Sequence, residues 1–256
     1  MIDPKAVIDP KAEVDEGVTI GAFSIISADV RIGKGTVVGP HVVIKGTTRI
    51  GEDNHIFQYA SIGEDPQDKK YAGEQTRLEI GDRNVIREFV TMNRGSVQDA
   101  VATRIGNDNL FMAYTHVAHD CQIGNHVIMA NAASLAGHVK IDDWAILSGF
   151  TMVHQFSHIG AHSFCGMGSA INKNVPPYVT VSGQPAKPYG INSEGLRRRG
   201  FDDEVITQIK RAYKLIYKKN IRLTEAVSIL MEMRQECDEL APLLHFIKHS
   251  ERSIVR

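Results

Sequence analysis

The sequence predicts a parallel β-helix, a stack of coils in which each turn adds short strands to the same flat faces. The first observation is a six-residue period: eleven consecutive positions spaced six apart, from Ile2 to Ile62, hold only Ile or Val. The second is that this register returns after each of two breaks, over residues 80–92 and 105–171. An α-helix repeats about every 3.6 residues and a strand about every two, so neither explains this period. Hexapeptide repeats are typical of parallel β-helices.

Other positions of the repeat describe the cross-section of the coil. The side chain four residues after the aliphatic one is usually small, as at Ala6, Ala12 and Ser24, which suits a tight interior. Glycine often follows the aliphatic residue, as at Gly21 and Gly33, and predicts a sharp backbone turn at the corners. Three faces of six residues give a coil of eighteen, so residues eighteen apart stack at about 4.8 Å.

The composition suits a protein with a large core and excludes several classes. The chain has 256 residues, of which 43% are apolar, and a formal net charge of −1. This balance favours neither nucleic acid nor a membrane surface as a partner. No window is apolar enough to span a bilayer.

The cysteines and the start of the chain indicate a cytoplasmic protein. Cys121, Cys165 and Cys237 are scattered, without a Cys-x-x-Cys motif, so we expect reduced thiols and no disulfides. The chain enters the repeat at once from Met1, and no apolar signal segment precedes it.

Two domains are predicted, a β-helix over residues 1–190 and an α-helical region over residues 191–256. The breaks in the repeat predict loop excursions near residues 63–79 and 93–104. Long loops on a rigid scaffold often carry binding functions, although a solvated insertion without a role explains them too.

Beyond the repeat the period becomes helical. We expect a helix from Phe201 to Lys219, a second over Glu225–Gln235 with Thr224 as its N-cap, and a third over Ala241–Ile254. These helices would cover the open end of the prism, where the last coil leaves a sheet edge exposed.

The helical region is locally basic. Between Arg197 and Arg222 there are nine Lys or Arg and three acidic residues, in a chain that is nearly neutral overall. A solvated helix face explains this charge, and so does a docking surface for an acidic partner or a phosphate.

Four histidines gather on the predicted prism. His119 lies two positions after the inward Val117 and should point outward, and Gly137 lies one coil above it. His138 stacks over Asp120 by the same count. The predicted patch consists of His116, His119, Asp120, Gly137, His138 and His154.

This patch suggests acid–base chemistry. A histidine beside an aspartate is a natural general base, because the acid orients one ring nitrogen while the other accepts a proton. Gly137 would leave room for a substrate and expose an N–H to a developing oxyanion. No Ser or Cys stands in a nucleophile motif nearby, which favours direct transfer to a hydroxyl or an amine.

Two other interpretations remain open from the residues. Prism proteins of the carbonic anhydrase type hold zinc between subunits with three histidines. The other interpretation is a purely structural role, in which a flat face binds ice or a partner. That role would favour a regular Thr ladder, which the sequence lacks.

With these residues in view, the chain resembles the bacterial acyl-[acyl-carrier-protein]–UDP-N-acetylglucosamine O-acyltransferases, which catalyse the first step of lipid A biosynthesis. The resemblance covers essentially the whole chain. It rests on residues 63–74, 116–121, 135–138, 153–156, 175–178 and 190–200. The related N-acyltransferase has an additional N-terminal domain, which this chain does not show before its repeat.

The resemblance implies a left-handed prism, a homotrimer with active sites between subunits, and transfer of an (R)-3-hydroxyacyl chain to the 3-position of UDP-N-acetylglucosamine. It implies that His119 is the general base, with Asp120 beside it and Gly137 as the oxyanion donor. It assigns substrate binding to Gln67, Asp68, Lys70, His116, His138, His154, Gln155, Asn192, Glu194, Arg198 and Arg199. No metal or cofactor is implied beyond the phosphopantetheine arm of the donor.

The resemblance also addresses specificity and partners. Met167 matches the position that limits acyl-chain length in the family, which implies a preference nearer ten carbons than fourteen. The acidic acyl carrier protein would dock on Lys210, Arg211 and Lys214. Some relatives use a 3-amino sugar nucleotide, and the sequence leaves hydroxyl and amine acceptors open.

Overall fold

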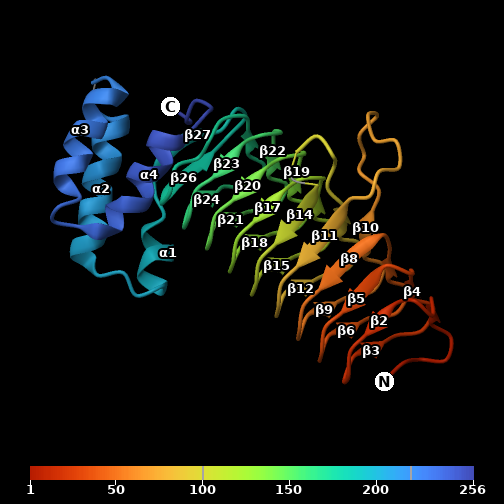
Figure 1. The fold of residues 1–256 in the computed structure, drawn as a ribbon. Helices are drawn as coiled ribbons and strands as arrows, with labels where there is room; N and C mark the ends of the chain where they lie inside the picture. Colours follow the sequence, from red (N-terminus) through yellow and green to blue (C-terminus); the bar gives the residue numbers. More distant parts are fainter. Residues whose placement is uncertain (100, 220) are drawn as a thin grey trace.

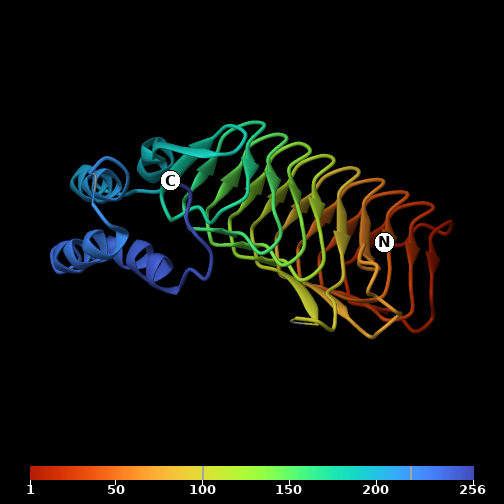
Figure 2. The same ribbon diagram turned by 90° about the horizontal axis from the view of Figure 1, so that it is seen from above.

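The computed structural model describes residues 1–99, 101–219 and 221–256. Residues 100 and 220, which fall in the predicted second excursion and in the predicted helical region, lie outside the described residues. The predicted fold class is confirmed: a left-handed parallel β-helix is followed by a small group of α-helices at one end (Figure 1). Seen from above, the coils follow one another along a single axis (Figure 2).

Three parallel sheets form the faces of the prism. Face 1 consists of β1 (Val7–Ile8), β4 (Ile25–Ile26), β7 (Val43–Ile44), β10 (Ser61–Glu64), β13 (Thr91–Asn93), β16 (His116–Val117), β19 (Ser134–Leu135), β22 (Met152–Val153) and β25 (Ala170–Ile171). Face 2 consists of β2 (Glu13–Val14), β5 (Val30–Ile32), β8 (Thr47–Ile50), β11 (Arg77–Ile80), β14 (Ala102–Ile105), β17 (Gln122–Ile123), β20 (Lys140–Ile141) and β23 (His158–Ile159).

Face 3, the third sheet, includes the one antiparallel pairing among the described strands, between β26 (Val179–Ser182) and β27 (Lys187–Ile191). It consists of β3 (Thr19–Ile20), β6 (Val37–Val38), β9 (His55–Ile56), β12 (Val85–Ile86), β15 (Leu110–Phe111), β18 (Ile128–Met129), β21 (Ile146–Leu147), β24 (Phe164–Cys165), β26 (Val179–Ser182) and β27 (Lys187–Ile191). We name the corners by the faces that they join: corner 1–2, corner 2–3 and corner 3–1.

The six-residue period is the inward register of these strands. Ile26 pairs with Ile44 and Ile44 with Ile62, eighteen residues apart, and all three are buried in one continuous core. Cys121, Cys165 and Cys237 are buried free thiols.

The corners turn differently from the sequence expectation. Left-handed backbone occurs three residues after the inward residue, mostly at non-glycine positions such as Phe23 and His41, and not at the following Gly21 and Gly33. These glycines serve close approach of neighbouring coils, because a Cβ on Gly21 would lie 2.6 Å from the nitrogen of Pro40.

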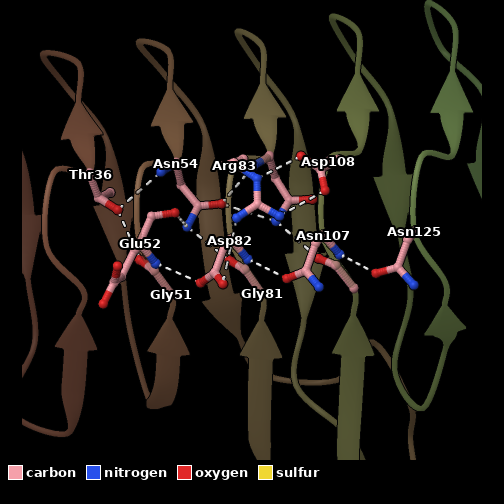
Figure 3. A network of polar contacts seen from close by, with 12 residues as sticks. Thr36, Gly51, Glu52, Asn54, Gly81, Asp82, Arg83, Asn107, Asp108 and Asn125 are labelled. Carbon is pink, nitrogen blue, oxygen red and sulfur yellow. Dashed lines mark hydrogen bonds and ion pairs between the residues drawn. The ribbon is translucent and has the colours of Figure 1, made fainter.

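Corner 2–3 is joined by ladders of amide side chains (Figure 3). Asn54 Oδ1 accepts hydrogen bonds from the backbone N–H and the side-chain amide of Asn84, and Asn84 does the same for Asn109. All three are buried, and each ladder satisfies polar groups that the closed prism would otherwise leave without partners.

The chain leaves the prism twice on the way from face 1 to face 2. Residues 65–76 separate β10 from β11, and residues 94–101 separate β13 from β14. Both lie at corner 1–2, and the orange segment that projects from the prism in Figure 1 is the first of them. Among the described residues, none of the helices is both long enough and apolar enough to cross a bilayer.

Four α-helices follow the prism: α1 (Ser193–Arg198), α2 (Asp203–Tyr217), α3 (Leu223–Met233) and α4 (Ala241–His249), with a short 3₁₀ helix over Asp238–Leu240 before α4. The predicted N-cap Thr224 is wrong, because α3 begins at Leu223 and Arg222 occupies the cap. The third helix is also shorter than predicted. The chain bends after His249 so that Ile254 pairs with Asn174 at the end of the prism: the Ser253 carbonyl accepts from Asn174 N–H, and Val255 N–H donates to the Asn174 carbonyl.

Candidate active site

His119 and Asp120 form a hydrogen-bonded pair at corner 1–2, just after β16. His119 Nδ1–H donates to Asp120 Oδ2 at 2.9 Å, which leaves Nε2 free to accept a proton. Asp120 adopts a left-handed backbone conformation, with φ 60°, and its side chain is completely buried. The pair therefore has the arrangement of an oriented general base.

Asp120 is held by more than the histidine. Its Oδ1 accepts from the backbone N–H of Ser96 at 2.9 Å and its Oδ2 from the Ser96 hydroxyl at 2.6 Å. Burial alone would raise the pKa of the Asp120 carboxyl, but hydrogen bonds from His119 and Ser96 outweigh it and lower the pKa below its ordinary value. The aspartate is therefore ionised at neutral pH and can stabilise a protonated His119.

Gly137 provides space for the imidazole of His119. A Cβ on Gly137 would lie 2.6 Å from His119 Cε1 and 2.7 Å from Nε2. The expectation that this glycine leaves room for a substrate is thus corrected, because the base itself fills the room. Among the backbone hydrogen bonds of the described residues, none has the Gly137 N–H as its donor.

The other three histidines of the predicted patch lie in different surroundings. His138 Nδ1–H donates to Asp99 at 2.7 Å, and its ring stacks on Phe156. His116 is hydrogen-bonded to the Thr91 hydroxyl at 2.7 Å, and burial together with the nearby His119 lowers its pKa. His154 is exposed, one coil beyond His138.

A cleft of about 1140 Å³ opens in front of the base. Of the residues predicted from the sequence, Gln67, Asp68, Lys70, His119, His138 and Gln155 line it. Asp120 and Gly137 adjoin His119 without lining the cleft themselves, and His116 and His154 do not line it either.

The cleft also includes residues that the sequence did not suggest. Gln98 and Asp99 come from the second excursion, and residues 249–252 come from the last residue of α4 and the segment that follows it. For Gln98 and Asp99, the break in the six-residue repeat was the signal in the sequence. Residues 249–252 could not be foreseen, because the sequence predicted a helix there.

The remaining predicted residues lie away from this cleft. Asn192 caps α1, and Glu194 pairs with Arg198 at 2.9 Å on the surface of that helix. The guanidinium of Arg199 lies over Trp144 and donates to His162 at corner 2–3. Burial lowers the pKa of His162 to about 4, and the charge of Arg199 adds to this, so His162 is neutral and accepts that bond.

Met167 lies at corner 3–1, between β24 and β25, and is 75% exposed in the single chain. Corners 2–3 and 3–1 are the two borders of face 3. The chain therefore carries the base at one corner, and Arg199 and Met167 at the two borders of the opposite face.

His119, Asp120 and His138 are the residues that come nearest to a metal site, with ligand atoms within 4.8 Å of one another. Both Nδ1 atoms are committed to carboxylates, and the Asp120 oxygens already accept three hydrogen bonds. Zinc would have to replace these bonds to reach a tetrahedral set of ligands. The cluster as it stands suits proton transfer.

Comparison with known proteins gives consistent matches over the whole chain. A family model described as "Udp N-acetylglucosamine O-acyltransferase; Domain 2" matches residues 174–255, and one described as "Bacterial transferase hexapeptide (six repeats)" matches residues 11–46 and 102–137. The chain is 56% identical to an acyl-[acyl-carrier-protein]–UDP-N-acetylglucosamine O-acyltransferase of Herminiimonas arsenicoxydans and 58% identical to one of Alkalilimnicola ehrlichii. Each alignment covers 100% of this chain and 99% of the relative.

Solved structures agree with the sequence matches. The UDP-N-acetylglucosamine acyltransferase of Francisella novicida is 42% identical and superimposes with a TM-score of 0.98, over 100% of this chain and 94% of that one. The corresponding structure from Acinetobacter baumannii is 47% identical, with a TM-score of 0.97 over 100% and 99% of the two chains.

Proposed function

Because the chain belongs to the family of acyl-[acyl-carrier-protein]–UDP-N-acetylglucosamine O-acyltransferases, as the sequence predicted, we propose that it acylates the 3-hydroxyl of UDP-N-acetylglucosamine with His119 as the general base. The chain is an acyltransferase that takes its acyl group from acyl carrier protein and acts in lipid A synthesis. The observation that carries the finer proposal is the His119–Asp120 pair, in which His119 lines the cleft with Nδ1 bonded to the aspartate and Nε2 left to accept a proton.

The proposed reaction needs no covalent enzyme intermediate. His119 Nε2 takes the proton of the sugar 3-hydroxyl as that oxygen attacks the thioester carbonyl of the donor. The oxyanion that forms lies against the Gly137 N–H, which has no backbone acceptor of its own among the described residues. The intermediate then expels the phosphopantetheine thiolate, which receives the proton from His119, and the acyl group stays on the sugar oxygen.

The substrates are placed by the surrounding residues. Gln67, Asp68 and Lys70 from the first excursion close over the sugar nucleotide, and His138 and Gln155 contact it from the floor of the cleft. His116, His154, Asn192, Glu194, Arg198 and Arg199 complete the site in a homotrimer, where a neighbouring subunit brings its own residues to the cleft. No cofactor is required beyond the arm that the donor carries.

Chain length, partner docking and location are also proposals. Met167 closes the acyl groove and favours a chain of about ten carbons, since a longer chain would press further methylenes against a filled end. Acyl carrier protein docks on Lys210, Arg211 and Lys214, which are exposed on α2. The buried free thiols support a reducing, cytoplasmic location.

Two alternatives differ in what they predict. Transfer to a 3-amino sugar nucleotide would use the same base, and comparison of the two acceptors with the pure protein distinguishes it. A zinc-dependent, carbonic-anhydrase-like reaction would lose activity with EDTA and recover it with zinc.

The test of the proposed base is His119→Ala. We expect kcat to fall by roughly 10²–10⁴-fold, while the trimer and the prism persist because the ring lines the cleft and is not part of the aliphatic core. His41→Ala, an exposed histidine near the N-terminal end of the prism, serves as the control and should retain activity. A His119→Ala variant with more than a third of the wild-type kcat would rule out this base.

A further inference from the structure

The second excursion of the prism supports the proposed base from behind. Ser96 lies on this loop, is 2% exposed, and bonds to Asp120 and not to solvent. We propose that Ser96 is a positioning residue, which holds the carboxylate of Asp120 in the one orientation that aims His119 into the cleft. This inference rests on the proposed function of His119.

The geometry fixes the carboxylate at both oxygens. One residue supplies two donors: the Ser96 N–H to Oδ1 at 2.9 Å and the Ser96 hydroxyl to Oδ2 at 2.6 Å. A carboxylate held at both oxygens cannot rotate about its Cβ–Cγ bond without breaking one of these bonds. Oδ2 therefore keeps its remaining lone pair directed at His119 Nδ1.

Neither Thr103 nor His138, the other polar side chains next to Asp120, holds its carboxylate. Thr103 accepts from the backbone N–H of Asp120 and does not reach its carboxylate. His138 Nδ1 lies 3.9 Å from Oδ2 and is bonded to Asp99 instead. Among the described residues, Ser96 and His119 are the two that hydrogen-bond to the Asp120 carboxylate.

Arg94, two residues before Ser96 on the second excursion, links this loop to the first one. Its guanidinium is almost completely buried and donates to the Gly63 carbonyl at 2.6 Å, to the Asp65 carboxylate and to the Tyr71 hydroxyl. Asp65 and Tyr71 flank the stretch that carries Asp68 and Lys70. The loop proposed to close over the sugar nucleotide and the residue behind the base thus share one buried anchor.

A positioning role predicts a loss in kcat rather than in substrate binding. Ser96→Ala should lower kcat by roughly tenfold to a hundredfold, because the imidazole is no longer held at its productive angle, while KM for UDP-N-acetylglucosamine stays close to the wild-type value. Ser96→Thr retains the hydroxyl and should recover most of the rate. Ser96→Cys keeps the volume but offers only a weak donor, so it should fold and still lose most of the rate.

Ser24→Ala is the matched control. Ser24 is as buried as Ser96, donates to the Gly39 carbonyl at 2.7 Å and accepts from Val42 N–H, in an early coil far from the cleft. It reports what the loss of a buried hydroxyl costs the fold, and it should leave kcat unchanged. The melting temperatures of the Ser24→Ala and Ser96→Ala variants should fall by similar amounts.

The double variant separates this inference from the function on which it rests. If Ser96 acts through His119, Ser96→Ala should cause no further loss in a His119→Ala protein. An inactive His119→Ala beside a fully active Ser96→Ala and Ser96→Cys would overturn the role of Ser96 alone. An active His119→Ala would overturn both, and an additive further loss in the double variant would show that Ser96 does not act through the base.

Discussion

The smallest side chain of the site determines where the proposed base can lie. Gly137 has no Cβ, and the imidazole of His119 packs against it so closely that a Cβ there would lie 2.6 Å from His119 Cε1. Contacts this short are essentially never made by a Cβ, so any other residue at 137 would displace the ring from its present position beside Asp120. The glycine is therefore a requirement of the base as well as a proposed oxyanion donor.

We expect Gly137→Ala to lower kcat by roughly 10²-fold, because a displacement of about 1 Å is enough to misplace a catalytic group. The fold should persist, since the ring can swing toward the open cleft. Gly190→Ala is the control, because a Cβ there meets nothing within 4 Å. Steady-state kinetics and thermal melting of both variants provide the measurement, and wild-type kcat in Gly137→Ala would contradict the argument.

Met167 is the residue for which specificity can be tested. Each methylene that cannot be buried in the acyl groove forfeits about 0.8 kcal/mol. We expect the wild type to prefer 3-hydroxyacyl donors near ten carbons, and Met167→Gly to shift the preference toward longer chains without changing KM for UDP-N-acetylglucosamine. Competition between donors of different length measures this. A wild-type preference for fourteen carbons, or an unshifted glycine variant, would show that Met167 does not limit the chain.

At the scale of elements, the sequence predicts those features in which the type of a residue is determined by its own place in the coil. Inward residues such as Ile26 and Ile44 are of this kind, because a closed prism admits only apolar side chains at that position, and the strands follow from them. The same counting placed Gly137 beside His119 and His138 over Asp120. The left-handed corner at Asp120 and the contact of Gly137 with the imidazole depend on backbone geometry that no residue type announces.

The excursions show the opposite case. A broken period marks where the chain leaves the prism, but it does not show what the loop returns to contact. Ser96 and Asp99 lie in the predicted second break, yet their bonds to Asp120 and His138 depend on how the loop folds back. The end of α4 at His249 likewise depends on a tertiary bond between Val255 and Asn174.

The exposed basic face of α2 makes a prediction for the acyl donor. Replacing Lys210, Arg211 and Lys214 together by Glu should raise KM for acyl carrier protein thioesters and leave KM for UDP-N-acetylglucosamine near the wild-type value. Added salt should weaken use of the donor in the same direction, because exposed charges are screened. The buried side of α2 is untouched by these changes.

The matched control reverses Lys5, Lys11 and Lys34, which are exposed in the first coils and change the net charge equally. These N-terminal coils lie at the end of the prism away from the helices (Figure 1). A docking site on α2 requires that only the first triple variant affects the donor. Equal effects of both triple variants would point to overall charge, and equal effects on both substrates to disturbed helices.

For the whole molecule, the distribution of the predicted residues over three corners favours a shared active site. The base lies at corner 1–2, Arg199 at corner 2–3 and Met167 at corner 3–1. One convex prism cannot direct three corners into one cleft. The two corners without the base both border face 3, so a neighbour that presents face 3 to the cleft would bring Arg199 and Met167 together. A cyclic trimer repeats this contact three times and closes.

Mixed trimers test this arrangement. His119→Ala and Arg199→Ala chains, carrying different tags, are each expected to form inactive trimers. Trimers purified through both tags contain two chains of one kind and one of the other. In either composition one site of the three combines an intact His119 with an intact Arg199 from the next subunit, so about a third of the wild-type kcat should return. Mixtures of His119→Ala with Asp120→Ala, whose residues serve the same cleft of one chain, should stay inactive. If the first mixture is also inactive, although each variant assembles, then Arg199 acts within its own chain and the active site is not shared between subunits.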